Sequence, residues 1–158
     1  MRPIERVALV SQADSRVAAL KARVESDTAL SGIDVASDLS ADEAAAEADI
    51  ITTVTSAGMP VFDGSQVRPG THINLAGAFR PNNREMDDEA AARADFFLDS
   101  AESCRARAGD ILMALQSGAI SEEQIKGEIG AVLAGMFYDD LSQNLSFLLD
   151  DGITRNLI

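Results

Sequence analysis

Two short apolar runs, at residues 50–54 and 72–75, constrain the fold more than any other feature of the sequence. Both contain β-branched residues and both are too short for a stable helix, so we predict a strand for each. Small and polar residues follow each run, at 55–58 and at 76–78. Because open α/β sheets bind ligands beyond the carboxyl ends of their strands, we expect these two loops to face a ligand.

Strands and helices alternate along the rest of the chain. Further strands are predicted at 7–11, 33–36 and 96–99, and helices at 14–25, 41–47, 86–94, 99–108, 110–116 and 121–134. Four leucines near the carboxyl end are spaced as one face of a further helix: Leu141, Leu145, Leu148 and Leu149. The alternation indicates βα units, and therefore an α/β fold with a mostly parallel sheet.

Length and charge exclude several classes of protein. The 158 residues suffice for one domain, and a net charge of −13 argues against nucleic-acid and anionic membrane partners. No apolar run approaches the ~20 residues of a membrane span, and the start has no apolar signal core. The single cysteine, Cys104, excludes an internal disulfide. We therefore expect an acidic cytoplasmic protein.

An ordered series of short motifs runs through residues 48–135. It comprises A-D-I-I at 48–51, Thr53, Thr55, P-V at 60–61, P-G-x-H-I-N at 69–74, Gly77, P-x-x-R-E-M-D at 81–87, G-D at 109–110 and E-I-G-A-V-L-A-G at 128–135. In this order, the motifs resemble the ornithine cyclodeaminase/mu-crystallin family, and the resemblance covers most of residues 4–135. It implies a Rossmann-like three-layer domain and the use of NAD(P)(H).

The family's glycine turn, G-x-G-x-x-G/A, does not occur in the sequence. By resemblance the strand at 7–11 is the family's second strand, so we expect a truncated domain that lacks the first β-α unit. The first strand is central in such a sheet, and buried backbone groups need partners. We therefore predict that the strands at 7–11 and 50–54 pair directly or that a second chain fills the gap between them.

The resemblance also implies cofactor-binding residues. The positions that match the family near the nucleotide are Thr53, Thr55, Ser56, Gly77 and Ala78. An acidic residue after the strand at 7–11 would bind the ribose of NAD and an arginine there would favour NADP, but S-Q-A at 11–13 supplies neither charge. Without the glycine turn, we expect no tightly bound cofactor and at most weak binding of NAD(P).

No residue is assigned to catalysis or to a metal. The cyclodeaminases place a catalytic aspartate two residues after the glycine that matches Gly77, and this chain has Phe79 there. Phenylalanine cannot transfer a proton, and F-R-P at 79–81 looks more like the reductase-type members of the family. We expect structural roles for His72, the only histidine, and for Cys104.

Two functions remain open from the sequence. In the first, residues 1–135 form a domain that is catalytically inert alone. Residues 136–158 form a helix and tail that join the core or a dimer contact. The whole chain then acts as a homo-oligomeric or binding module. In the second, an oligomer or partner completes an NAD(P)-dependent cyclodeaminase or imine/keto-acid reductase. The missing glycine turn and Phe79 favour the first. A chain shortened by a shifted start codon would have coding sequence for the glycine turn upstream.

Overall fold

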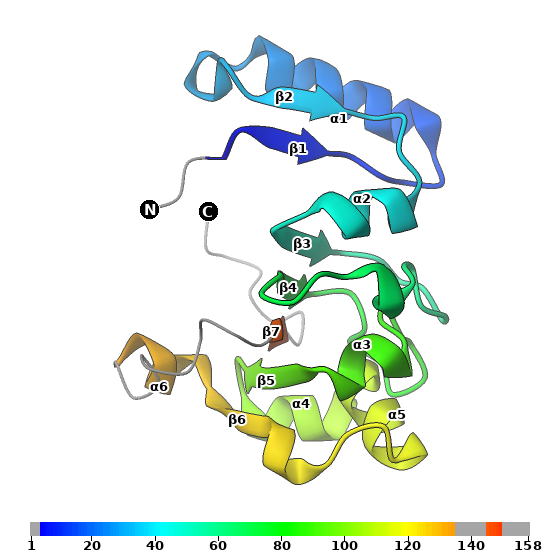
Figure 1. Cartoon of the computed structure of the whole chain (residues 1–158), viewed down its shortest axis with the longest axis vertical. Coiled ribbons are helices and arrows are strands. Elements are labelled where there is room, and N and C mark those ends of the chain that lie inside the picture. The colour runs from blue at the N-terminus through cyan, green and yellow to red at the C-terminus, as the bar shows by residue number, and fades with distance from the viewer. Residues whose placement is uncertain (1–3, 135–144, 150–158) are drawn as a thin grey trace. The chain divides into compact units, whose positions relative to one another are not determined.

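The computed structural model describes residues 4–134 and 145–149 and divides the chain into two compact units, Met1–Ala44 and Ala45–Ile158 (Figure 1). All strand pairs in both units are parallel. The predicted α/β fold with a mostly parallel sheet is therefore confirmed. The expected boundary at residue 135 is a separate matter from this division and stays a prediction.

The first unit is built on one pair of strands. β1 (Arg6–Ala8) pairs with β2 (Asp34–Ala36), with Val7 opposite Val35. The connection between them contains α1 (Asp14–Ser26) and the short 3-10 helix η1 (Thr28–Leu30), and α1 packs against β2. Parallel strands need such a crossover, which explains why a helix separates two strands of only three residues.

The second unit contains a five-stranded sheet in the order β3-β4-β7-β5-β6. Its strands are β3 (Ile50–Thr53), β4 (His72–Leu75), β5 (Ala94–Leu98), β6 (Ile125–Glu128) and β7 (Leu145–Leu149). In β5, Phe96, Phe97 and Leu98 are all buried, as expected for a parallel strand that is covered on both faces. The order β4-β7-β5 means that the last strand among the described residues lies in the middle of the sheet.

Helices cover and connect these strands. They are α2 (Ala41–Glu47), η2 (Gly64–Gln66), α3 (Asp88–Ala92), α4 (Ala101–Arg107), α5 (Gly109–Ser117), η3 (Glu122–Gln124) and α6 (Ile129–Leu133). The predicted capping box opens α2, where Ser40 N donates to Glu43 Oε2 at 2.8 Å and Glu43 N donates to Ser40 Oγ at 3.2 Å. None of the helices in the described part of the chain is long and apolar enough to span a membrane.

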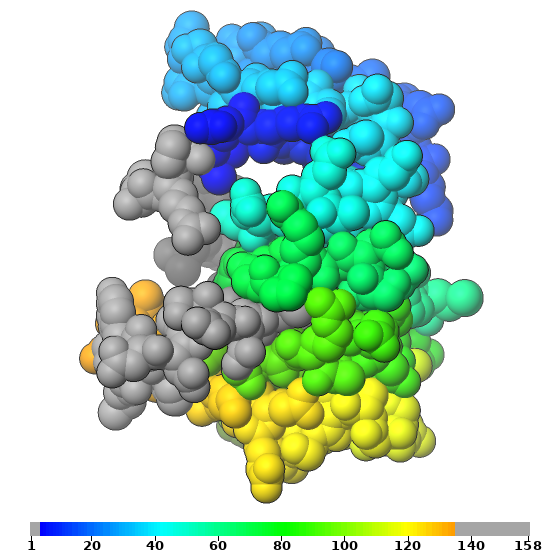
Figure 2. All heavy atoms as spheres, viewed as in Figure 1, coloured from blue at the N-terminus to red at the C-terminus, as the bar shows by residue number. Residues whose placement is uncertain are grey.

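The core of the second unit lies around β4, β5 and α5. Its largest fully buried apolar side chains are Phe96, Ile73, Leu75, Met86, Leu98 and Ile111. In the space-filling view, the green and yellow segments of this unit are closely packed over the visible face (Figure 2). Met86 comes from the loop that precedes α3, so this loop is anchored in the core.

The prediction of one helix over 121–134 is wrong for the first half of this segment. Residues 122–124 form η3 and 125–128 form β6, and only 129–133 are helical. Ser121 and Gln124 make the predicted reciprocal cap, but they close one 3-10 turn. The chain then pairs with β5, with Ile125 opposite Phe96. A free sheet edge therefore outweighed the local helical preference of this segment.

The helix predicted from the four leucines is also wrong where the structure describes it. Leu145–Leu149 form β7, and Phe147 lies in register with Ile73 of β4 and Phe96 of β5. A short apolar run fits a buried strand as well as a helix, and leucine spacing alone does not separate the two. The rest of the predicted segment, 136–144 and 150–158, lies outside the described residues.

β1 and β3 belong to different units, so their predicted direct pairing would join the two units and stays a prediction. β1 is hydrogen-bonded to β2 within the first unit, and β3 stands at one end of the five-stranded order within the second. The alternative, that another chain pairs with β3, also stays a prediction.

Candidate functional site

The loops that follow β3 and β4 are tied together by one carboxylate, that of Glu85. Glu85 is fully buried and accepts hydrogen bonds from Thr53 Oγ1 at 2.9 Å, from Thr55 N at 2.5 Å and from Gly77 N at 2.7 Å. We call these four residues the Glu85 clamp. Because donors from two loops meet one buried side chain, the clamp fixes both loops at the carboxyl edge of the sheet.

Gly77 makes the close approach of the two loops possible. A Cβ atom at this position would lie less than 3.0 Å from the carbonyl oxygen and the nitrogen of Thr55, and also from Glu85 Oε1. Two of these three neighbours are backbone atoms, which cannot move away as a flexible side chain can. Gly77 is therefore required by space, and the two loops form a small-residue shelf at the strand ends.

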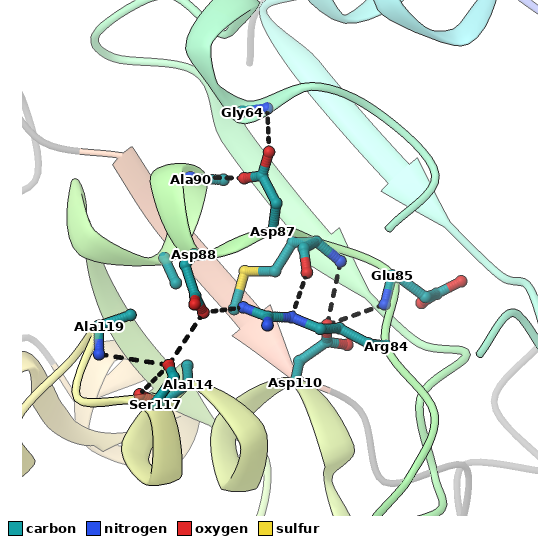
Figure 3. Close-up of polar contacts among 12 residues, drawn as sticks. Gly64, Arg84, Glu85, Asp87, Asp88, Ala90, Asp110, Ala114, Ser117 and Ala119 are labelled. Carbon is teal, nitrogen blue, oxygen red and sulfur yellow. Dashed lines mark hydrogen bonds and ion pairs between the residues drawn. The ribbon is translucent and has the colours of Figure 1, made fainter. Parts of the chain in front are cut away.

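A second buried carboxylate, that of Asp110, holds the segment that carries Glu85. Asp110 lies in the first turn of α5, and its Oδ1 accepts from Glu85 N at 2.9 Å and from Met86 N at 3.0 Å (Figure 3). Its Oδ2 is buried and has no hydrogen-bond partner in the described part of the chain. Burial raises the pKa of Asp110 to about 6, against the two backbone hydrogen bonds, which lower it.

Arg84 fixes the other side of the same segment. Its Nε donates to the carbonyl oxygen of Met86 at 2.5 Å, and its Nη2 forms an ion pair with Asp88. Ser117 Oγ also donates to Asp88, at 3.1 Å, so α3 and α5 are linked through one carboxylate (Figure 3). The hydrogen bond from Arg84 is the main cause that lowers the pKa of Asp88.

Asp87 caps α3 and holds the loop before η2. Its carboxylate accepts from Ala90 N at 2.8 Å and from Gly64 N at 2.9 Å (Figure 3). A carboxylate at this position suits the helix dipole. The R-E-M-D motif at 84–87 therefore acts as a scaffold: each polar side chain in it fixes a loop or a helix end.

All five predicted cofactor-binding residues lie at the carboxyl ends of β3 and β4. Thr53, Thr55 and Gly77 belong to the clamp, and the hydroxyl of Thr53 is used by Glu85. Ser56 is exposed, and its carbonyl oxygen accepts from Asn83 Nδ2 at 3.3 Å. Ala78 is buried, and its carbonyl oxygen accepts from Gly109 N at 2.9 Å. The structure thus brings the predicted residues together.

Sequence reasoning assigned no role to Glu85 or Asp110. Both lie inside motifs that were recognised, R-E-M-D and G-D, but their roles depend on which backbone nitrogens they meet in the fold. The sequence did offer one signal for Glu85. This charged residue stands next to Met86, an apolar residue that is buried in the core. Such a residue must be paired when buried, which marks it as a structural anchor.

Three other candidates lie outside the clamp. Phe79 is 41% exposed, and the Arg80 guanidinium carbon lies 5.3 Å from the centre of its ring. His72 Nε2 lies 2.9 Å from Asn74 Oδ1. The Cys104 thiol is buried and donates to Asp99 Oδ1 at 3.2 Å. None of these contacts touches the shelf.

A parallel sheet with closely packed, small-residue loops at its carboxyl edge is the form of a Rossmann-like nucleotide-binding domain. The model of the ornithine cyclodeaminase/mu-crystallin family matches residues 1–140, and the chain belongs to this family. The family expected from the motifs is therefore confirmed.

Two similar curated proteins are named as reductases. The chain is 43% identical over 86 residues to Delta(1)-pyrroline-2-carboxylate reductase of Paracoccus denitrificans, covering 54% of this chain and 27% of that protein. It is 44% identical over 96 residues to the ketimine reductase mu-crystallin of Mus musculus, covering 61% of this chain and 28% of that protein. The matches thus span less than a third of these relatives.

Solved structures show the same fold over more of the chain. Delta(1)-pyrroline-2-carboxylate reductase of Thermococcus litoralis, in complex with NADH and L-proline, has a TM-score of 0.80 and 28% identity, covering 93% of this chain and 45% of that chain. Iminosuccinate reductase of Paracoccus denitrificans, in complex with NAD+, has a TM-score of 0.67 and 30% identity, covering 86% and 39%. This chain spans less than half of each.

Proposed function

We propose that the chain forms the nucleotide-facing part of an NAD(P)H-dependent reductase that acts on the C=N bond of an imine bearing a carboxylate. The observation that carries this proposal is the Glu85 clamp, which holds Gly77 and Thr55 in one rigid shelf at the strand ends. The similar reductases support the substrate class. NAD(P)H supplies the hydride when it is bound.

The residues of the shelf fit a dinucleotide. The missing Cβ of Gly77 lets the loop after β4 pack directly on the loop after β3, since Thr55 and Glu85 fill that position. Thr55 and Ser56 are exposed and offer hydroxyl groups beside it. Small residues at strand ends let a ligand approach the backbone, so Thr55 and Ser56 would hold the cofactor while Gly77 keeps the two loops together.

The complete reaction needs groups beyond the shelf. Phe79 lies two residues after Gly77 and cannot move a proton or hold a charged substrate. The neighbouring Arg80 is exposed and suited to a carboxylate, but its guanidinium already lies over the Phe79 ring. We infer that further polypeptide, in the same or another chain, supplies the acid group and the remainder of the substrate site.

A self-associating, catalytically inert domain is the second candidate. The terminal position of β3 in the sheet of the second unit favours it, because edge strands present backbone groups that a partner strand can pair with. Ile50 at the start of β3 is 50% exposed, and Val54 just after it is 74% exposed. A second copy of the chain that pairs along β3 would cover both side chains.

One titration separates the two candidates. Purified protein is titrated with NADH and followed by nucleotide fluorescence, while light scattering records its mass. Saturable binding that Ser56→Trp weakens and Gly58→Ala preserves would support the reductase, because Ser56 is exposed on the shelf and a Cβ at Gly58 meets no atom within 4 Å. A stable dimer that binds neither NADH nor NADPH would support the inert domain and refute the reductase.

A further inference from the structure

Asp110 is a buried carboxyl group that is only half used. The side chain is fully buried, and its Oδ1 accepts from the backbone nitrogens of Glu85 and Met86. Its Oδ2 meets no hydrogen-bond partner among the residues that the structure describes (Figure 3). Burying such an oxygen costs less free energy when the carboxyl group is neutral than when it is charged. The order of the surrounding segments is therefore sensitive to the protonation of Asp110.

The first turn of α5 contacts both loops of the shelf. Asp110 holds the backbone of Glu85, and the carboxylate of Glu85 holds Thr55 and Gly77. Beside Asp110, the nitrogen of Gly109 donates to the carbonyl oxygen of Ala78 at 2.9 Å. Movement of this turn would therefore be transmitted to the loop after β3 and to the loop after β4.

The charges nearest to Asp110 come from the segment that it holds. The charge of Glu85 disfavours ionisation of Asp110, and the charge of Arg84 favours it. Asp110 is itself the only charged residue of α5. The elements beside α5 carry further charged groups: Asp88 and Glu89 of α3, Glu102, Arg105 and Arg107 of α4, and Arg80 of the loop after β4. All of these except Asp88 are exposed, so water screens their effect on a buried group.

We propose that Asp110 is a proton-controlled switch of the shelf. When Asp110 carries a proton, the first turn of α5 stays bound to residues 84–86 and the clamp is closed. When Asp110 loses its proton, this contact opens more often, water reaches the carboxylate, and both loops of the shelf separate. The inference concerns the order of the shelf and does not depend on the proposed reductase, so either can fail without the other.

The loops can open without unfolding of the sheet. Thr55, Ser56 and Gly58 in the first loop and residues 79–82 beyond the second are exposed. The strand β4 between them is anchored separately, because Ile73 and Leu75 are buried in the core. Loops with exposed backbone and few buried contacts belong to the parts of a protein that open at low free-energy cost.

The direction of the pH effect follows from the two states of Asp110. Burial raises its pKa to about 6 in the closed form, whereas a hydrated carboxyl group in the open form would have the ordinary value of 3.8. The closed form binds the proton more tightly, so the ratio of closed to open forms falls as pH rises. For these two values the ratio falls about tenfold between pH 5 and pH 7 and levels off above that range.

Amide hydrogen exchange of the full chain, followed by nuclear magnetic resonance, tests the switch. The informative amides are those of Thr55, Gly77 and Glu85, whose hydrogen bonds form the connection to Asp110. After correction for the intrinsic pH dependence of exchange, their opening constants should rise about tenfold from pH 5 to pH 7. In Asp110→Asn, which keeps an acceptor oxygen but cannot titrate, they should not change with pH.

Two variants serve as controls. Asp88→Asn makes the same chemical change at a neighbouring carboxylate. The hydrogen bond from Arg84 lowers the pKa of Asp88, so this group stays ionised from pH 5 to pH 7. His72→Gln removes the only histidine, the residue type that ordinarily changes charge in this range. The tenfold rise should persist in both variants, and its loss in either would overturn the assignment to Asp110.

Urea at low concentration distinguishes local opening from complete unfolding. Local opening exposes little surface and depends weakly on urea, whereas complete unfolding depends on it steeply. Shelf amides that respond to urea as steeply as those of β5 would overturn the switch. Opening constants that are equal at pH 5 and pH 7 in the wild type, or that rise equally in Asp110→Asn, would also overturn it.

One measurement requires no variant and remains valid if Asp110→Asn does not fold. The side-chain carboxyl ¹³C shift of Asp110 in the wild-type chain should change with a midpoint near pH 6. A midpoint near the ordinary value of 3.8 would overturn the switch, because the closed form would then hold the proton no more tightly than the open form.

Discussion

The carboxylate of Glu85 lies 2.7 Å from the backbone nitrogen of Gly77 and joins the ends of two neighbouring parallel strands. The same carboxylate meets the nitrogen of Thr55 at 2.5 Å, so one side chain satisfies donors from the loops after β3 and β4. Unpaired buried donors are destabilising, and these two are paired by a group that is itself fully buried. The geometry of the shelf therefore depends on Glu85.

Replacing Glu85 by glutamine is expected to lower the free energy of unfolding by about 2–3 kcal/mol. The substitution keeps the shape of the side chain, but its amide nitrogen would face a backbone N–H and leave it unpaired. Urea unfolding measures the change. Thr53→Val is the milder comparison, because it removes one hydroxyl at 2.9 Å and is expected to cost about 1 kcal/mol. Equal midpoints for Glu85→Gln and the wild type would contradict the clamp.

Asp110 is expected to make stability depend on pH. Its pKa is about 6 in the folded protein against an ordinary value of 3.8, so the folded state holds this proton more tightly than the unfolded state. The contribution of Asp110 to stability is therefore greatest below about pH 4 and is lost as pH rises through about 6. The difference between these two pKa values corresponds to a change of about 3 kcal/mol in the free energy of unfolding.

Asp110→Asn isolates this effect. Asparagine keeps an oxygen for the two backbone donors and removes the titration. The difference in unfolding free energy between the variant and the wild type is expected to move by about 2.5 kcal/mol in favour of the variant between pH 4 and pH 8. A difference that stays constant over this range, measured by urea unfolding at each pH, would show that Asp110 does not titrate there.

Gly109 is expected to tolerate no side chain. A Cβ atom there would come within about 3 Å of the carbonyl oxygens of Arg80 and Asn83, both of which are backbone atoms. Gly109→Ala should therefore destabilise the protein by about 1–3 kcal/mol through overpacking. Gly130→Ala in α6 is the matched control, because its Cβ meets nothing within 4 Å and alanine favours helix. Thermal unfolding compares the two, and similar losses would contradict the packing argument.

Arg93 is expected to hold the turn at η2. Its Nη1 donates to the carbonyl oxygen of Gly64 at 2.9 Å and its Nη2 to that of Val67 at 2.8 Å. Lysine cannot make both bonds in this forked geometry, so Arg93→Lys should cost about 1 kcal/mol and speed amide exchange at 64–67. The exposed Arg23→Lys serves as control. Unchanged exchange rates would show that the fork does not stabilise the turn.

The elements that could be predicted from sequence are those with strong local signals. The strand at 72–75 was predicted with its observed bounds, and the helix at 41–47 begins at the predicted capping box of Ser40 and Glu43. These signals arise from residues within one turn or one strand. The two errors, at 121–134 and at 145–149, fall on segments whose conformation depends on pairing with β5.

The sequence by itself determined the fold class, the family and the loops at the strand ends, because apolar spacing and ordered motifs are local properties of the chain. Only the tertiary structure decided that β7 enters the middle of the sheet and that Glu85 and Asp110 are buried anchors. Those features depend on contacts between distant segments. A carboxylate becomes a clamp only when the fold brings backbone donors to it and removes water from around it.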